Sequence, residues 1–198
     1  MGLLTAPWSE TISFKGHRYH VNAAFDTVLM VQQLYKDERL TDMDKVIQAL
    51  RMLVRERIRV WCLPDAQKAE LLQEVVKQHI ELPKRPPSRK QTRLVDFDLD
   101  GDYIYASFRQ AYGIDLLAEQ GRLHWKRFIM LFQGLPENTK IREVMKIRGM
   151  DLPEPNKYNQ KERQSLVELK YYYALPAVGG GGQQGLDALF SSLEARAI

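Results

Sequence analysis

Residues 12–21 read Ile-Ser-Phe-Lys-Gly-His-Arg-Tyr-His-Val, and the fold can be worked out from this stretch. Apolar and polar residues alternate on both sides of a glycine, which predicts a short β-hairpin. Apolar residues then recur at intervals of three and four, the spacing of a buried helix face. These residues are Phe25, Val28, Leu29, Val31 and Tyr35. The pattern therefore predicts a hairpin followed by a helix.

Two further helices are predicted in the first half of the chain. Thr41, with Asp44 three residues later, has the pattern of a capping box and would open the second helix. The apolar residues of that helix are Val46, Ile47, Leu50, Leu53 and Val54. Pro64-Asp65 would open the third helix, which carries Leu71, Leu72, Val75, Val76 and Ile80. Residues 1–81 are thus expected to form a β-hairpin with a helical subdomain.

Residues 82–93 interrupt the helical periodicity. They contain three prolines and five basic residues and no acidic residue. Such a composition is typical of an extended, solvated connector. We therefore expect two small helical subdomains, at residues 1–81 and 94–176, joined by a basic, proline-rich linker.

Four helices are predicted in the second half, each with a recognisable end. Three of them, at about 102–112, 123–133 and 138–148, are each followed by a glycine, and the fourth, at about 157–174, stops before Pro176. Glycine after the last turn and proline beyond it are the residues that end helices. The predicted fold is mostly α-helical and begins with a β-hairpin.

The last 22 residues have a different character. Residues 177–185 include four consecutive glycines and predict a hinge. Residues 186–198 predict a short amphipathic tail helix, too short to be stable alone. Its apolar stripe consists of Leu186, Leu189, Phe190 and Leu193. A segment of this kind gains order on another surface, so the stripe is predicted to bind a partner or a second copy of the chain.

The net charge of +4 comes from the linker, because residues 1–81 and 94–176 each hold equal numbers of basic and acidic side chains. A nucleic-acid-binding protein displays its excess charge over a folded face, and the linker has no aromatic residue for base stacking. No apolar run approaches the ~20 residues that cross a bilayer, and the N-terminus lacks the pattern of a secretory signal. We expect no nucleic-acid or membrane partner, and a cytoplasmic location.

Residues 96–102, Asp-Phe-Asp-Leu-Asp-Gly-Asp, are the closest approach to a metal or catalytic motif. A calcium loop needs a glutamate at its twelfth position, which is Ser107 here. A phosphatase of the haloacid dehalogenase class would use Asp98 as nucleophile and Asp100 as acid. That chemistry needs a surrounding parallel α/β sheet, which is not predicted. We interpret the motif as an acidic turn before a helix, whose carboxylates accept free backbone N–H groups.

The remaining reactive side chains do not form a catalytic or metal-binding pattern. Cys62 is the only cysteine and is interpreted as a small buried hydrophobe. His17 and His20 lack the further ligands of a zinc site and are interpreted as residues on a strand face. No nucleophile elbow, zinc-protease or phosphate-loop motif is present in the sequence. We therefore expect no enzymatic activity, no metal, no cofactor and no small-molecule substrate.

Aromatic residues are concentrated in the second half of the chain. One predicted helix carries Tyr103, Tyr105, Phe108 and Tyr112, the next carries Trp125, Phe128 and Phe132, and the last ends in three tyrosines at 171–173. Most of these residues are expected to form the core. Any excess would form a groove for a partner helix, and Tyr103 and Trp125 are the candidate partner-binding residues.

Several segments resemble a family of phage proteins. In the second half they are residues 96–108, 110–116, 123–128, 134–140 and 170–176; in the first half they are the hairpin, Phe25–Leu29 and Leu40–Val46. The family is catalogued as phage "gene product fifteen" and occurs in long-tailed phages and prophages of Gram-positive bacteria. The resemblance covers roughly residues 1–176 with the order of motifs preserved.

The resemblance implies a tail assembly chaperone encoded between the tail-tube protein and the tape-measure protein. Such a protein would bind the tape-measure protein, keep it soluble while tube subunits polymerise around it, and be absent from the mature virion. The tail-tube protein is a further expected partner. The alternative is a structural tail or neck component that stays in the virion. The family brings no catalytic residues, and residues 177–198 lie outside the resemblance.

Overall fold

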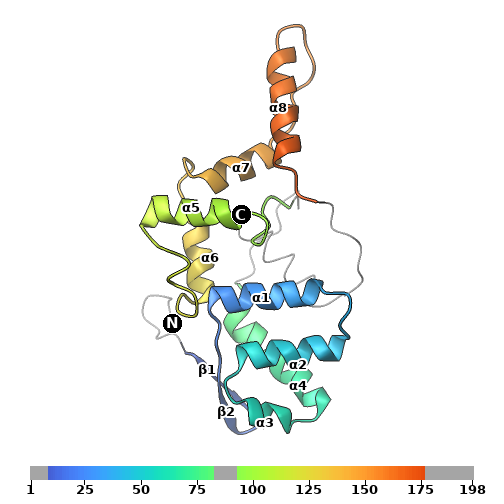
Figure 1. Cartoon of the computed structure of the whole chain (residues 1–198), viewed down its shortest axis with the longest axis vertical. Helices are drawn as coiled ribbons and strands as arrows, with labels where there is room; N and C mark the ends of the chain where they lie inside the picture. Colours follow the sequence, from blue (N-terminus) through green and yellow to red (C-terminus); the bar gives the residue numbers. More distant parts are fainter. Residues whose placement is uncertain (1–8, 83–92, 177–198) are drawn as a thin grey trace. The chain divides into compact units, whose positions relative to one another are not determined.

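The computed structural model describes residues 9–82 and 93–176 of the 198-residue chain. These residues form a β-hairpin followed by helices (Figure 1), so the predicted fold class is confirmed. The chain divides into two compact units. Of the described residues, unit 1 contains 9–82 and 120–128, and unit 2 contains 93–119 and 129–176.

The hairpin of unit 1 consists of β1 (Thr11–Phe14) and β2 (His17–His20), paired antiparallel with Phe14 opposite His17. Lys15 and Gly16 form the two-residue turn, and both have positive φ angles, of 47° and 80°. This is the backbone twist that favours a tight hairpin, and glycine adopts it without strain. An isolated bridge between Val21 and Val54 attaches the hairpin to the end of the second helix.

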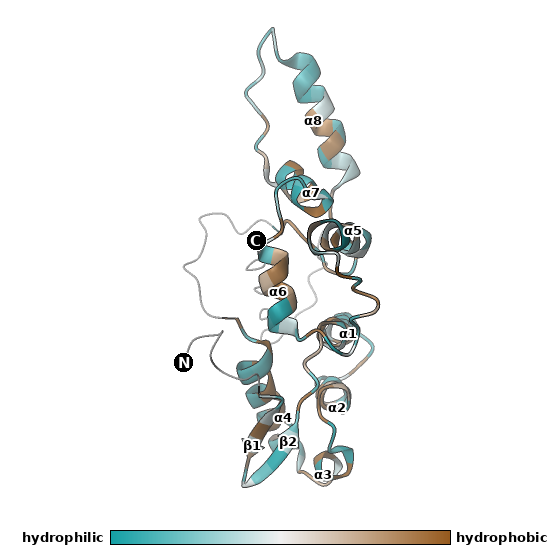
Figure 2. Cartoon of the chain, turned by 90° about the vertical axis from the view of Figure 1, so that its left-hand side faces the viewer, coloured by the Kyte–Doolittle hydropathy of each residue, from teal (hydrophilic) through white to brown (hydrophobic). Residues whose placement is uncertain are grey.

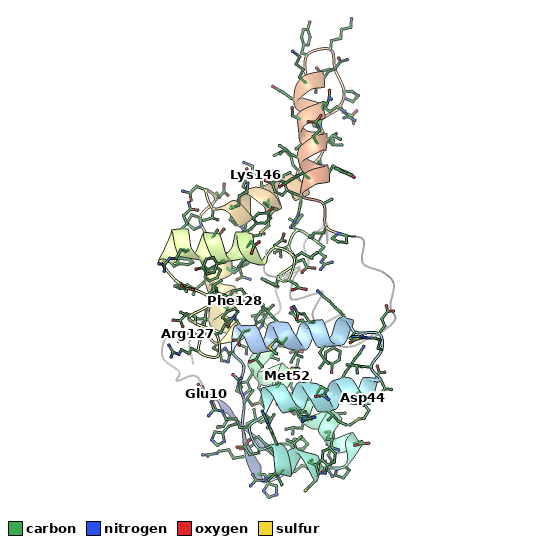
Figure 3. All side chains as sticks on the ribbon, in the orientation of Figure 1. Glu10, Asp44, Met52, Arg127, Phe128 and Lys146 are labelled. Atoms are coloured by element: carbon green, nitrogen blue, oxygen red, sulfur yellow. The ribbon has the colours of Figure 1, made fainter. Side chains whose placement is uncertain are left out.

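Three long helical segments follow the hairpin in unit 1. They are α1 (Phe25–Lys36), α2 (Asp42–Leu53) and α4 (Asp65–Val75), which continues as the π-helical turn η1 (Val76–Ile80). The predicted capping box is present: the Thr41 hydroxyl accepts the Asp44 N–H, and the Asp44 carboxylate accepts the Thr41 N–H. Asp44 lies at the start of α2 in Figure 3.

One short helix of unit 1 is absent from the sequence prediction. It is α3 (Arg57–Trp61), five residues that read Arg-Ile-Arg-Val-Trp. A helix of this length shows too little of the 3.6-residue period to be recognised. The third predicted helix also differs in its last turn, where the Glu81 N–H bonds to the Val76 carbonyl at 2.8 Å in the π-helical pattern.

Residues 120–128 pack in unit 1, although the sequence suggested one continuous second subdomain at 94–176. Backbone hydrogen bonds join Phe25 N–H to the Leu123 carbonyl at 2.9 Å and Trp125 N–H to the Ala23 carbonyl at 2.8 Å. The ring of Phe128, labelled in Figure 3, stacks on that of Phe25 with centroids 5.0 Å apart. Such pairing between distant segments leaves no trace in local periodicity.

The linker predicted at 82–93 lies almost wholly outside the described residues.

Unit 2 is built from α5 (Gly101–Tyr112), α7 (Lys140–Gly149) and α8 (Gln160–Tyr172), with the end of α6 (Trp125–Gln133). Gly113 ends α5 in the left-handed conformation, with φ of 68°, as its position predicts. The core side chains include Val95, Phe97, Ile104, Phe108, Ile129, Phe132, Ile141, Val144 and Met145. The predicted helix order is thus confirmed, with ends that differ by up to three residues.

Candidate partner-binding surface

Helix α8 buries none of its side chains. Its apolar residues are concentrated in its C-terminal half, as the brown segments of Figure 2 show. Tyr171 is 86% exposed, Tyr172 74%, Val167 44% and Leu169 43%. We call these four residues the α8 surface. A helix within a folded unit normally packs its apolar residues on the core, so this one has an apolar surface available to a partner.

Polar contacts hold α8 in unit 2. The Lys170 ammonium donates to the backbone carbonyls of Ile147, Arg148 and Met150, at 3.0, 2.8 and 2.7 Å. A lysine that donates to the last carbonyls of a helix satisfies groups left without an intrahelical partner, and here the helix is α7. The Arg148 Nε also donates to the Tyr173 carbonyl, at 2.6 Å. These contacts hold the helix while the residues of the α8 surface stay exposed.

Tyr103, one of the predicted partner-binding residues, lies beside this attachment. Its side chain is half-buried, and its ring meets that of Tyr173 edge-on with centroids 6.0 Å apart. The Lys140 ammonium donates to the Tyr173 hydroxyl at 2.9 Å. This hydrogen bond raises the pKa of Lys140 above its usual value, with a smaller contribution from Glu143. Tyr103 therefore supports the end of α8.

Trp125, the other predicted partner-binding residue on a helix, is fully buried. Its ring stacks against that of Phe128 with centroids 5.7 Å apart, within unit 1. Trp125 therefore belongs to the core of unit 1 and presents no surface to a partner. Hydrophobicity alone cannot separate these roles, because tryptophan anchors both cores and interfaces. Leu186, Leu189, Phe190 and Leu193 lie outside the described residues.

The acidic segment at residues 96–102 forms the predicted turn before a helix. One carboxylate oxygen of Asp96 accepts the N–H groups of Asp98 and Leu99, at 2.8 and 3.1 Å, and Asp96 also pairs with Arg93. Asp100 accepts two hydrogen bonds from Arg148. Donors within the protein thus bind the carboxylates of Asp96 and Asp100 in this segment. In the part of the chain that the structure describes, no three His, Cys, Asp or Glu side chains are grouped as metal ligands.

Cys62 and four histidines complete the chemically reactive side chains of unit 1. Cys62 is exposed, so its interpretation as a buried hydrophobe is wrong: it follows α3, whose outer face is open. His17 and His20 lie on β2 as predicted, and His20 Nδ1 lies 2.5 Å from a carboxylate oxygen of Glu56.

His79 and His124 lie with ring centroids 6.3 Å apart. Burial lowers the pKa of His79, and burial followed by the charges of His79, Lys126 and Arg127 lowers that of His124 to about 4.

The chain matches the family described as Bacteriophage Gp15 protein over residues 7–175. A match over most of the chain defines its class, a bacteriophage protein. The chain belongs to the Gp15 family, and the predicted family is confirmed. No curated protein and no solved structure matches it. Within residues 9–82 and 93–176, no helix combines the length and apolar character that a bilayer crossing needs.

Proposed function

We propose that this Gp15-family protein is a tail assembly chaperone of long-tailed phages or prophages of Gram-positive bacteria. It binds the tape-measure protein in the host cytoplasm, keeps it soluble while the tail tube assembles, and is absent from the mature virion. It acts by stoichiometric binding and catalyses no reaction. The observation that supports the proposal is the α8 surface, a group of exposed apolar side chains on one helix of a phage protein.

The α8 surface suits a client with exposed apolar residues. Tyr171 and Val167 are one helical turn apart and form a continuous strip, because residues at i and i+4 are neighbours on a helix. Full burial of a large apolar side chain contributes about 1.5–3 kcal/mol, so two such residues would raise the affinity by a factor of ten or more. Tyrosine also keeps its hydroxyl in water while its ring is covered.

Co-expression with the tape-measure protein tests the proposal. We expect the intact chain to raise the soluble fraction of the tape-measure protein and to co-purify with it. The double variant Val167→Lys with Tyr171→Lys should reduce co-purification by about tenfold or more. Lysine suits this test, because it is a good helix former at both positions, and at position 171 its charge is also favourable near the helix C-terminus.

A matched control comes from the loop before α8. Tyr158 is 96% exposed, so Tyr158→Lys makes the same change outside the α8 surface and should leave co-purification unchanged. The double change Leu189→Asp with Phe190→Asp tests the predicted tail stripe in the same assay.

If the tape-measure protein never co-purifies with the intact chain, the chaperone role is wrong. Mass spectrometry of purified virions should find no copies, and a constant number per particle would identify a structural component.

A further inference from the structure

An open groove of about 290 Å³ lies within unit 1, lined by residues of α2, α3 and α4. Its apolar wall consists of Ile47, Ile58, Val60 and Trp61. Ile58 is 84% exposed and Trp61 73%, and they lie three residues apart on the outer face of α3. Large apolar side chains exposed around a concavity are typical of a protein-binding surface. We call this site the α3 groove.

The rim of the α3 groove is entirely basic. Arg51 from α2, Arg57 from α3 and Lys68 from α4 line it, and no acidic residue does. Lys68 is already paired, with Asp65 at 2.9 Å, and its ammonium lies 5.8 Å from the centre of the Trp61 ring. The guanidinium groups of Arg51 and Arg57 are exposed and have neither a hydrogen bond nor an ion pair among residues 9–82 and 93–176. Two cations therefore remain available beside an apolar wall.

We infer that the α3 groove binds an acidic amphipathic helix of a partner protein. One large apolar side chain of that helix enters between Ile58 and Trp61. Carboxylates on either side of it reach Arg51 and Arg57, since arginine forms paired hydrogen bonds with carboxylates. The basic rim selects against a basic or neutral helix, because charge complementarity sets specificity and the rate of association. The inference is independent of the tape-measure protein and of the α8 surface.

A pair of synthetic helical peptides tests the inference on the full chain. One carries a stripe of leucine and phenylalanine flanked by glutamates; the other has lysine in place of each glutamate. Titration calorimetry should show that the glutamate peptide binds at least about tenfold more tightly and that its affinity falls as salt is added. An environment-sensitive fluorophore on Cys62, the only cysteine and the neighbour of Trp61, provides a second measurement.

Variants test separately how the basic rim and the apolar wall of the α3 groove contribute to peptide binding. The double change Arg51→Glu with Arg57→Glu should reverse the preference, so that the lysine peptide binds more tightly. Both positions are exposed, so the fold should be kept, and thermal unfolding checks this. Ile58→Asp should abolish binding of the glutamate peptide. Leu117→Asp, a control at a position 67% exposed in unit 2, should leave it unchanged.

Three results would overturn the inference. The first is equal affinity for the two peptides. The second is a charge-reversed variant that keeps the original preference. The third is self-association in sedimentation experiments that Ile58→Asp abolishes, because the occupant would then be a second copy of this chain. Loss of tape-measure co-purification in the α8 variants, with unchanged peptide binding here, would leave the inference standing.

Discussion

Arg148 donates hydrogen bonds to both carboxylate oxygens of Asp100, at 2.6 and 2.8 Å. Its side chain is 8% exposed and that of Asp100 is 2% exposed. The same guanidinium donates to the carbonyl of Leu94 at 2.9 Å and to that of Tyr173 at 2.6 Å. One side chain on α7 thus joins the turn before α5, the segment ahead of that turn and the end of α8.

Arg148→Met should strongly destabilise unit 2. The change leaves the buried carboxylate of Asp100 without its cation, and breaking a buried pair from one side costs about 3–5 kcal/mol. Urea unfolding measures the loss. Lys146→Met, at an exposed position of the same helix labelled in Figure 3, is the control and should change the free energy of unfolding by less than about 0.5 kcal/mol.

A second change isolates the pair itself. The double variant Arg148→Met with Asp100→Leu removes both charges, so it should cost less than the sum of the two single variants. Additive losses would show that the two side chains act separately, contrary to the geometry.

Lys170→Met should loosen α8 without unfolding the rest of unit 2. The ammonium makes three hydrogen bonds to carbonyls at the end of α7, and hydrogen bonds from charged groups contribute about 1.5–3 kcal/mol. Hydrogen exchange over residues 160–172 should accelerate by about tenfold or more, while residues 101–112 keep their protection. Lys161→Met, an exposed position on α8, should leave exchange unchanged.

Unit 1 should lose stability between about pH 6.5 and pH 4. The pKa of His124 is about 4 in the fold against 6.5 for a free histidine, mainly because the ring is buried. In that window the unfolded chain binds the proton and the folded chain does not, so stability is present above pH 6.5 and falls as the pH drops. The slope is up to about 1.4 kcal/mol per pH unit for this group, and the lowered pKa of His79 acts in the same direction.

Substitution identifies the group responsible. His124→Gln should flatten the pH dependence of unfolding, followed by tryptophan fluorescence, whereas His17→Gln, at an exposed position on β2, should not. An unchanged slope in His124→Gln would assign the pH dependence to other groups.

Cys62 should react with a thiol reagent in the native protein. Its side chain is exposed, so one equivalent of Ellman's reagent should react before any denaturant is added. If the thiol reacted only after unfolding, the result would show that Cys62 is buried, as its apolar neighbours in the sequence suggested.

Local patterns predicted most of the fold and little of the candidate site. Thr41 with Asp44 and the glycine at 113 signal helix ends through neighbours in the chain, so the start of α2 and the end of α5 were predictable. The pair of Arg148 and Asp100 joins residues 48 apart, and no local pattern connects them. The exposure of single side chains could not be predicted either. Trp125 and Trp61 are the same residue type, yet Trp125 is buried and Trp61 is 73% exposed.

The polar attachment of α8 has a thermodynamic consequence. Because this helix buries no side chain, its apolar surface is hydrated in the free protein. Any partner that covers it removes that water for the first time, and loss of apolar hydration lowers the heat capacity. Complex formation at α8 will therefore have an enthalpy that becomes steadily more favourable as the temperature rises, and its apolar contribution to affinity will weaken in the cold.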